Sequence, residues 1–545
     1  MCCSDMCPFD ISEKPGFTKF LLQNSVIKQA DELPSAVTVS HLGLLSVYDE
    51  TLIKVREIIS EAPKTVAMTT DLWTDNHKRR SYATFTLHFC TADFCMHNIV
   101  LRTVVFPESH IGENIKAAMD ETVRLFGLQD KRIVYVTDQG SNVVKACKLA
   151  DVERYGCVAH GLHNLIMTDG IGKCELARTI IDKVKELIKS FTYKTSFLEK
   201  EAREIANETA VRQMEALCDQ LDLDEQIEVE HEVGTESEGQ EEPCSSKNSN
   251  RSCKQVRATT LKKFCQTRWN TIHTMLSSVV ENQEIVERCL SRLRFFDKML
   301  SDNEWQTIKN FAQFLAVFKQ ATAILSGSKY PTVSLVLLFR AEIRQALQIS
   351  PTDCLMLQTL KRDMQEALER KLPVTELQVV AAMLDPSLRH LDAVQEFLTT
   401  QGINAVDLLS RCVDKYVGDD SSEIVLQTDK PAFSQEDMPW KKAKMELLSK
   451  HSCTLSGPSR EIQQYRCLSV ETDNPLEWWG TQKATYKQLS QLARAILPIP
   501  ATSAPSERIF SLTGVLINAK RSSLSPSTVD KVVFVHENSG FVCGP

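Results

Sequence analysis

The spacing of hydrophobic residues divides the chain into a mixed first part and a helical second part. In the first part, short runs rich in Val, Thr and aromatic residues are typical of strands. The predicted strands cover Thr65–Thr70, Ser81–Cys90, His97–Val105, Ile133–Thr137 and Gly156–Ala159. Apolar residues at three- and four-residue spacing predict helices at Ile115–Leu125 and Asn142–Leu149. This order of elements predicts an α/β core.

The second part of the chain has helical spacing almost throughout. Predicted helices cover Trp269–Val286, Glu304–Leu325, Ser334–Ala346 and Cys354–Arg370. Thr485–Leu497 is a clear amphipathic helix, which Pro498 ends. Ser525 and Pro526 begin a last helix, because Ser is a favoured N-cap and Pro fits the first helical position. We therefore expect a large helical region after the α/β core.

Charge is unevenly distributed between these two parts. The net charge is −8, yet twelve Asp or Glu and no Lys or Arg lie between Glu215 and Glu242. Without that segment the balance is −8 + 12 = +4, so the remainder is mildly basic and nucleic acid stays a possible partner. The polar composition of residues 222–256 predicts an acidic disordered linker, since it offers too little apolar surface to fold.

Membrane and secreted classes do not fit the composition. No apolar run reaches the ~18 residues that a membrane span needs. The first residues lack the basic and apolar regions of a signal peptide. The 18 cysteines are scattered rather than dense, so we expect reduced thiols in a cytosolic or nuclear protein with no membrane partner.

Two acids follow predicted strands directly. Asp71 follows the first strand, and Asp138 follows the fourth. At the carboxyl ends of neighbouring strands, two acids can share divalent cations such as Mg²⁺, which prefers oxygen ligands. Two metal ions ~3.5–4 Å apart would activate a water or a 3′-hydroxyl and stabilise the leaving oxygen. The alternative is that both acids cap loops, as acids after strands often do.

Several motifs resemble hAT-family transposases and their domesticated relatives among the BED zinc finger proteins. The two acids stand in Thr69–Thr74 and Val136–Asn142, which are similar to that family's two Asp signatures. The other similar segments are Cys157–His160, Leu261–Lys263 with Thr267–Asn270, Asn474–Trp479 and Ser506–Ser511. These ordered motifs span about residues 8 to 538, so the resemblance covers nearly the whole chain.

The resemblance implies an RNase H-like core interrupted by a long all-helical insertion, with a helical hAT C-terminal dimerisation region. The implied domains are an N-terminal helical segment (1–60), the first part of the core (61–200), a helical connector (201–221), the linker (222–256), the insertion (257–473), the dimerisation region that completes the core (474–538) and a tail (539–545). The family's N-terminal BED finger is not expected here, because Cys2, Cys3 and Cys7 have no His pair after them at finger spacing.

The resemblance also assigns site residues. Glu507 would join Asp71 and Asp138 as the third acid of a triad that binds Mg²⁺ or Mn²⁺; the alternative is an acid in the first turn of a helix. Trp269 matches a tryptophan that stacks near a flipped base in active relatives, or it anchors a helix in the core. Arg268 would contact phosphate or pair with acids. His160 would handle DNA ends or, with Cys157 and His163, form a structural strand-to-helix motif. A zinc site is not expected, since no second ligand pair lies near Cys157.

The C-terminal region is predicted to form a homodimer or higher oligomer. The residues assigned to dimerisation are Trp478, Trp479, Leu489, Leu492, Ile496 and Phe510; the alternative is that all of them pack within one chain. Two functions follow from the resemblance. One is a non-catalytic nuclear protein that acts through dimerisation and low-specificity DNA or chromatin association in transcriptional regulation. The other is an active metal-dependent DNA transposase.

Overall fold

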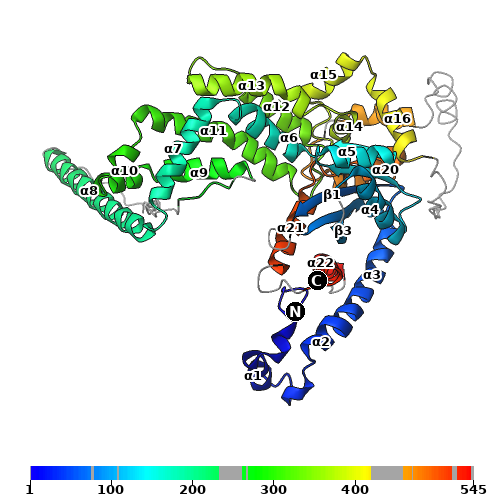
Figure 1. Cartoon of the computed structure of the whole chain (residues 1–545). Coiled ribbons are helices and arrows are strands. Elements are labelled where there is room, and N and C mark those ends of the chain that lie inside the picture. Colours follow the sequence, from blue (N-terminus) through cyan, green and yellow to red (C-terminus); the bar gives the residue numbers. More distant parts are fainter. Residues whose placement is uncertain are drawn as a thin grey trace, which may run out of the picture. The chain divides into compact units, whose positions relative to one another are not determined.

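The computed structural model describes residues 2–74, 79–106, 110–231, 261–265, 268–418, 458–468, 470–517 and 524–541. The chain forms two compact units (Figure 1). Unit 1 comprises Met1–Leu165, Gln320–Ala346 and Gln365–Pro545, and unit 2 comprises Ile166–Lys319 and Leu347–Met364. The fold is mixed α/β, with a five-stranded sheet in unit 1 and many helices.

The sheet contains β1 (Thr65–Thr74), β2 (Ser81–Cys90), β3 (Met96–Phe106), β4 (Arg132–Thr137) and β5 (Glu153–Gly156). Its strand order is β3-β2-β1-β4-β5. The first three strands pair antiparallel, whereas β4 pairs parallel to both β1 and β5. The prediction of four strands is confirmed, but a strand at Gly156–Ala159 is wrong: β5 ends at Gly156, and Val158 begins a helix.

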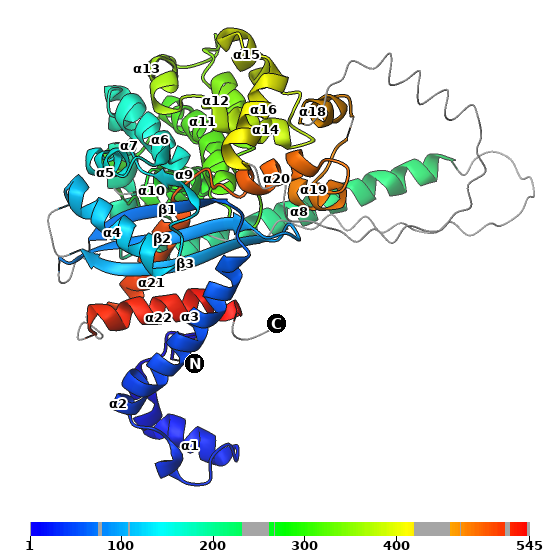
Figure 2. The same ribbon diagram turned by 90° about the vertical axis from the view of Figure 1, so that its right-hand side faces the viewer.

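Helices cover both faces of this sheet (Figure 2). Val66 and Met68 of β1 point to one face, where they join a core with α3 (Leu44–Ser60), α4 (Gly112–Leu125) and α5 (Ser141–Leu149). Ala67 of β1 and Val134 of β4 point to the other face and join a core with α14 (Glu376–Leu384), α16 (Ala405–Tyr416) and α20 (Lys487–Ile496). Burial on both faces explains why β1 and β4 are apolar almost throughout.

Helix α22 (Pro526–Asn538) covers the open edge of β3. The Oδ1 of Asp530 accepts a hydrogen bond from the Thr103 N–H at 2.6 Å, and the Asn538 amide donates to the Val100 carbonyl at 2.8 Å. These bonds occupy backbone groups that an uncovered edge strand would offer to another chain. The C-terminal helices therefore complete the unit that begins with the sheet.

The remaining helices of unit 1 are α1 (Pro15–Gln23), α2 (Ala36–Thr38), α6 (Val158–Asn164), α12 (Val336–Ala346), α15 (Asp392–Gln401), α18 (Pro458–Arg466), α19 (Pro475–Gln482) and α21 (Ala504–Leu516). Unit 2 contains α7 (Glu175–Ser190), α8 (Thr195–His231), α9 (Asn270–Glu281) and α10 (Gln283–Arg292), whereas α11 (Asp302–Leu325) and α13 (Leu355–Lys371) each have residues in both units. None of the helices that the structure describes is long and apolar enough to cross a membrane.

The two compact units divide the chain at other positions than the predicted domains, which remain a prediction. The predicted insertion, 257–473, is shared between both units, and residues 166–200 of the predicted core belong to unit 2. Helix α8 extends the predicted connector to His231, so the backbone of 222–231 is helical where a linker is predicted. Residues 232–256 of that linker lie outside the described residues. Periodicity locates helices, but it does not reveal which sheet or helix each apolar face will meet.

Candidate functional site

Asp71 and Asp138 lie at the carboxyl ends of two adjacent parallel strands. Asp71 is near the end of β1, and Asp138 follows β4 directly. The backbone N–H of Leu72 donates to Asp71 Oδ1 at 2.8 Å, and that of Gly140 donates to Asp138 Oδ1 at 3.1 Å. Arg154 of β5 donates to the Asp138 carbonyl and thereby fixes the turn after β4. Both carboxylates therefore accept a backbone N–H group close to them in the sequence, but only Asp138 lies in a turn, because β1 continues to Thr74.

Glu507 reaches this edge of the sheet from the far end of the sequence. It lies in the first turn of α21, which follows a short segment bonded to the start of α6. The Val158 N–H donates to the Ala501 carbonyl at 3.0 Å, and the Ser503 N–H donates to the Cys157 Sγ at 3.2 Å. Cys157 is in turn tied to β4, since its N–H donates to the Thr137 carbonyl at 2.7 Å. These bonds place α21 beside the ends of β1 and β4.

The charges of Glu507 and Asp138 act on Asp71. Asp71 is 8% exposed. Burial, followed by the negative charges of Glu507 and Asp138, raises the pKa of Asp71 to about 7. Among the described residues, however, the oxygen atoms of these three carboxylates do not all lie within 4.8 Å of one another. The predicted acids therefore share one electrostatic site, and their carboxylates stand apart within it.

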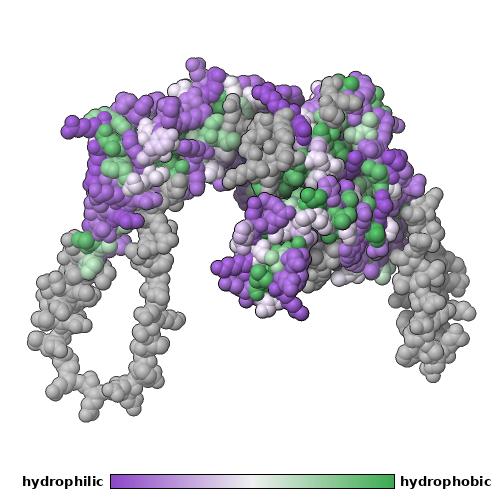
Figure 3. Space-filling model, turned by 60° about the horizontal axis from the view of Figure 1, so that its bottom comes forward, coloured by the Kyte–Doolittle hydropathy of each residue, from purple (hydrophilic) through white to green (hydrophobic). Residues whose placement is uncertain are grey.

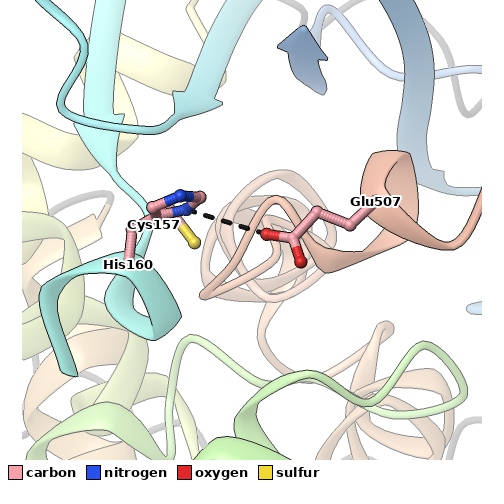
Figure 4. A group of neighbouring side chains, drawn as sticks. All are labelled: Cys157, His160 and Glu507. Atoms are coloured by element: carbon pink, nitrogen blue, oxygen red, sulfur yellow. Dashed lines mark ion pairs between the residues drawn. The ribbon is translucent and has the colours of Figure 1, made fainter. Parts of the chain in front are cut away.

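Glu507 lies closer to a Cys–His pair than the sequence indicates. One ligand atom from each of Cys157, His160 and Glu507 lies within 4.8 Å of the other two. Figure 4 shows the Glu507 carboxylate pointing toward the His160 ring, with the Cys157 sulfur beside that ring, and the Nδ1–Oε1 distance is 3.7 Å. The Cys157 side chain, together with the charges of Asp71 and Glu507, raises the pKa of His160 to about 9. His163 is not part of this group.

A buried hydrogen-bond chain that the sequence does not reveal holds α21 on the sheet. The hydroxyl of Ser506, next to Glu507, lies 2.9 Å from Thr69 Oγ1 of β1. Thr69 Oγ1 is also 3.0 Å from Nε2 of His88, whose Nδ1 lies 2.6 Å from Asn98 Oδ1. Burial lowers the pKa of His88 to about 4, so the ring is neutral at physiological pH. Strand pairing alone could have indicated that His88 of β2 lies beside β1, but not that Thr69 links it to Ser506 of α21.

Arg268 and Trp269 belong to unit 2. Trp269 is 2% exposed at the start of α9, among a core that includes Ile272 and Met275. This burial favours the core-anchor alternative over stacking on a base. Arg268 is exposed, which leaves its side chain accessible to phosphate.

The residues predicted to form the dimer interface are mostly buried in their own chain. Trp479, Leu489, Leu492 and Ile496 are fully buried in the core of unit 1. The Trp479 indole N–H donates to the Leu384 carbonyl at 2.7 Å, which fixes α19 on α14. Trp478 packs against this same core, and the Phe510 ring stacks on Trp73 at 5.9 Å. The burial of Trp479, Leu489, Leu492 and Ile496 favours the one-chain packing alternative for these four side chains, whereas Trp478 and Phe510 are partly exposed.

Exposed apolar residues lie elsewhere in unit 1. Large apolar side chains of the N-terminal segment are open to solvent, including Phe20, Val37, Leu42 and Ile53 on helices and Val26 in the bend after α1. Figure 3 shows hydrophobic patches set among hydrophilic residues on the face that it presents. Such patches mark candidate contact surfaces.

Two segments of the chain match known families. Residues 460–539 match the hAT family C-terminal dimerisation region, and residues 69–152 match the ZBED1 RNase-like domain. The first segment contains α18 to α22 apart from the start of α18, and the second contains β2 to β4 and most of β1. Asp71 and Asp138 thus lie in the RNase-like match, and Glu507 lies in the dimerisation match.

Relatives along most of the chain carry names of the same kind. A Zea mays protein named as an AC transposase is 21% identical over 96% of this chain and 62% of its own length. The Hobo transposase of Drosophila melanogaster is 22% identical over 93% of this chain and 76% of its own length. Human zinc finger BED domain-containing protein 4 is 20% identical over 98% of this chain, which spans 42% of that protein. The resemblance inferred from the motifs is confirmed: the chain contains a hAT dimerisation region and a ZBED1 RNase-like domain, and its relatives are named as transposases and BED zinc finger proteins.

Proposed function

We propose that this chain is a hAT transposase-like nuclear protein that associates with DNA and uses Asp71, Asp138 and Glu507 to cleave DNA strands with a divalent metal. The observation that carries the proposal is the placement of the three acids at one edge of the sheet, near the end of β1, directly after β4 and in the first turn of α21, close enough for Glu507 and Asp138 to raise the pKa of Asp71. A cluster of like charges around a buried carboxylate is costly, and a divalent cation would offset that cost. Perturbed acids of this kind are typical of functional sites.

The donor set suits Mg²⁺ or Mn²⁺. All three side chains offer carboxylate oxygens, and these cations prefer oxygen ligands. Bound metal would supply Lewis-acid stabilisation of charge and an activated water or 3′-hydroxyl. Asp71 and Asp138, held by the backbone N–H groups of Leu72 and Gly140, would anchor the cation. Glu507, on the first turn of α21, would close the site.

The sheet supports an RNase H-like description of this core. Three antiparallel strands followed by two parallel strands, with acids after β1 and β4, agree with the arrangement that the resemblance implies. Self-association through the C-terminal region is part of the proposal, supported by the match over residues 460–539. Because Leu489 and its neighbours are buried, contact between two copies would use other surfaces, such as the apolar N-terminal helices.

The test is metal-dependent nicking of supercoiled DNA by the full chain. We expect nicking with Mg²⁺ or Mn²⁺ that Asp138→Asn abolishes. Asp530→Asn is the matched control. Asp530 is a buried acid of unit 1 that lies on α22 and bonds to β3 rather than to the site. Absence of nicking by the folded wild-type protein, or equal nicking by Asp138→Asn, would contradict the proposal.

A second function rests on the pairing of Glu507 with His160. If that ion pair holds Glu507 away from Asp71 and Asp138, the chain keeps the fold without the chemistry. It would then act as a non-catalytic nuclear protein in transcriptional regulation, through self-association and DNA contact. Calorimetry separates the two functions: micromolar Mn²⁺ binding that Asp71→Asn abolishes supports catalysis. DNA binding without metal binding supports the regulator.

A further inference from the structure

We propose that Cys157, His160 and Glu507 form a second metal site, one that binds a thiophilic divalent cation such as Zn²⁺. The three side chains come from the start of α6 and the first turn of α21, and they point toward one another (Figure 4). One ligand atom from each lies within 4.8 Å of the others. Four-coordinate zinc sites with S, N and O ligands at 2.0–2.3 Å need a separation of this order, after small side-chain adjustments.

The surroundings prepare the Cys157 sulfur for a metal. Cys157 is 1% exposed, and its sulfur already accepts the Ser503 N–H at 3.2 Å. Backbone N–H groups that donate to a ligand sulfur stabilise the thiolate and orient it, as outer-shell contacts of metal ligands do. The backbone N–H of Cys157 donates to the Thr137 carbonyl, so this ligand, at the N-cap of α6, is held against the end of β4.

His160 also presents a buried ring nitrogen to the group. Its Nδ1 is buried and has no hydrogen-bond partner among the described residues, while it faces the Glu507 Oε1 at 3.7 Å. A buried ring nitrogen without a partner is costly, and coordination would satisfy it. On binding, the Cys157 thiol and any protonated His160 ring release their protons to solvent, so the thiolate and the neutral ring coordinate the cation.

Three protein ligands leave a fourth position open, as in zinc sites that exchange a water or substrate. Glu507 would belong to both this site and the proposed Asp71–Asp138–Glu507 site. Zn²⁺ bound by Cys157 and His160 would therefore withdraw Glu507 from the acid site and oppose Mn²⁺ binding there. This competition rests on the proposed function, whereas zinc binding itself does not.

Co²⁺, a spectroscopic substitute for Zn²⁺, tests the site in the full chain. We expect a thiolate-to-cobalt charge-transfer band and intense visible bands of a tetrahedral ion, both lost on addition of excess Zn²⁺. Cys157→Ser should abolish the charge-transfer band. Cys147→Ser is the matched control, because Cys147 is equally buried in unit 1 but lies on α5 outside the group. Its spectrum should match that of the wild type.

Glu507→Gln provides a second variant, on a side chain that is 43% exposed. It should keep the thiolate band and weaken Co²⁺ binding by at least about tenfold, because loss of a ligand costs no less than the ~10–100-fold that loss of an outer-shell partner costs. A wild-type spectrum without a thiolate band, or a band that persists in folded Cys157→Ser, overturns the proposal. So does unchanged affinity in Glu507→Gln. If Mn²⁺ does not bind at all, the proposed function fails while the cobalt result still decides the zinc site.

Discussion

Asp71 combines burial with two nearby negative charges, an arrangement that opposes its own ionisation. The side chain lies at the end of β1 between the turn after β4 and the first turn of α21. Desolvation contributes most to the raised pKa, the charge of Glu507 comes next, and His160 partly offsets both. In the unfolded chain this carboxyl titrates near 3.8, whereas in the folded chain it titrates near 7. Between these two values, the folded state binds the proton more tightly.

This shift predicts that removal of a proposed catalytic acid stabilises the protein. The free energy of unfolding should fall, through Asp71, as pH rises from about 4 to about 7, because the folded state binds more protons there. Asp71→Asn keeps the acceptor for the Leu72 N–H and removes the charge. At pH 8 without metal it should raise the free energy of unfolding by up to about 4 kcal/mol, at 1.36 kcal/mol for each pKa unit.

Urea unfolding at pH 4 and pH 8 measures this difference. The wild type and Asp71→Asn should be nearly equal at pH 4 and diverge at pH 8. A gain that is the same at both values would show that packing, not charge, is responsible. Asp385→Asn serves as a comparison that shows the effect of burial alone. Burial raises the pKa of Asp385, and no carboxylate of the proposed site contributes to that shift.

The pKa of His160 should respond to the charges of the same site. Its pKa of about 9 depends on the Cys157 side chain and on the carboxylates of Asp71 and Glu507. Glu507→Gln should therefore move the pKa of His160 down toward its ordinary value of 6.5. NMR titration of labelled histidines checks this, with His163 of the same helix as an internal reference whose pKa burial lowers. An unchanged His160 titration would contradict the closeness of these groups.

At the scale of elements, α21 matters because it brings Glu507 to strands from much earlier in the sequence. Its attachment is polar where it meets β1: Ser506 bonds to Thr69, which bonds to His88. Arg508, which follows Glu507 on the same helix, donates to Ser328 Oγ at 3.0 Å. A network of this kind fixes the orientation of α21 on the sheet, because each hydroxyl and each ring nitrogen can form a hydrogen bond in only a few geometries.

Removal of one bond in this network should loosen the site more than the fold. Ser506→Ala should lower the free energy of unfolding by about 0.5–1.5 kcal/mol, the usual net value of one hydrogen bond. It should also weaken Mn²⁺ binding, because Glu507 is the adjacent residue. Thr513→Val removes another buried hydroxyl of α21, one that bonds only within the helix. Calorimetry should find Mn²⁺ affinity unchanged in that variant; equal weakening in both would deny Ser506 a positioning role.

Helix α20 is attached by apolar residues, in contrast to the polar attachment of α21. Leu489→Ala should lower the free energy of unfolding by about 2–5 kcal/mol, the cost of a large-to-small change in a packed core. The folded fraction should keep its oligomeric state, since Leu489 faces α14 and α16 rather than a partner. Denaturant unfolding with light scattering checks both parts. If the wild type is an oligomer and Leu489→Ala is a folded monomer, Leu489 belongs to the interface and this prediction is wrong.

The sequence permits prediction of the elements and of the acids, but not of their neighbours. Alternation and apolar runs identify β1 to β4, and acids after β1 and β4 follow from strand direction. The approach of Glu507 to Cys157 and His160 depends on bonds between Ala501, Ser503 and the start of α6, which no local pattern encodes. Likewise, the amphipathic stripe of α20 shows that one face needs cover without showing whether the cover is its own chain or another.

At the scale of the whole molecule, the site belongs to unit 1 alone, although unit 1 is assembled from three separate stretches of chain. Metal that binds the folded state stabilises it by mass action, about 2.7 kcal/mol at one hundred times the dissociation constant. Hydrogen exchange with saturating Mn²⁺ should therefore slow in peptides from β1, the turn after β4 and α21. Helices α9 and α10 of unit 2 should exchange as before. Uniform protection across both units would indicate a different binding mode.

The late position of α21 and α22 has a consequence for biosynthesis. A ribosome adds about 5–20 residues each second, so about 20–70 s separate the synthesis of Asp138 from that of Glu507. During that interval the edge of β3 lacks its α22 cover, and Tyr82 and Val100 lack the apolar residues of α21 and α22. The nascent chain thus presents an open strand and bare apolar surface, which chaperones bind. Premature stop codons before α22 would make that exposure permanent, and such products are expected to aggregate rather than persist as shortened proteins.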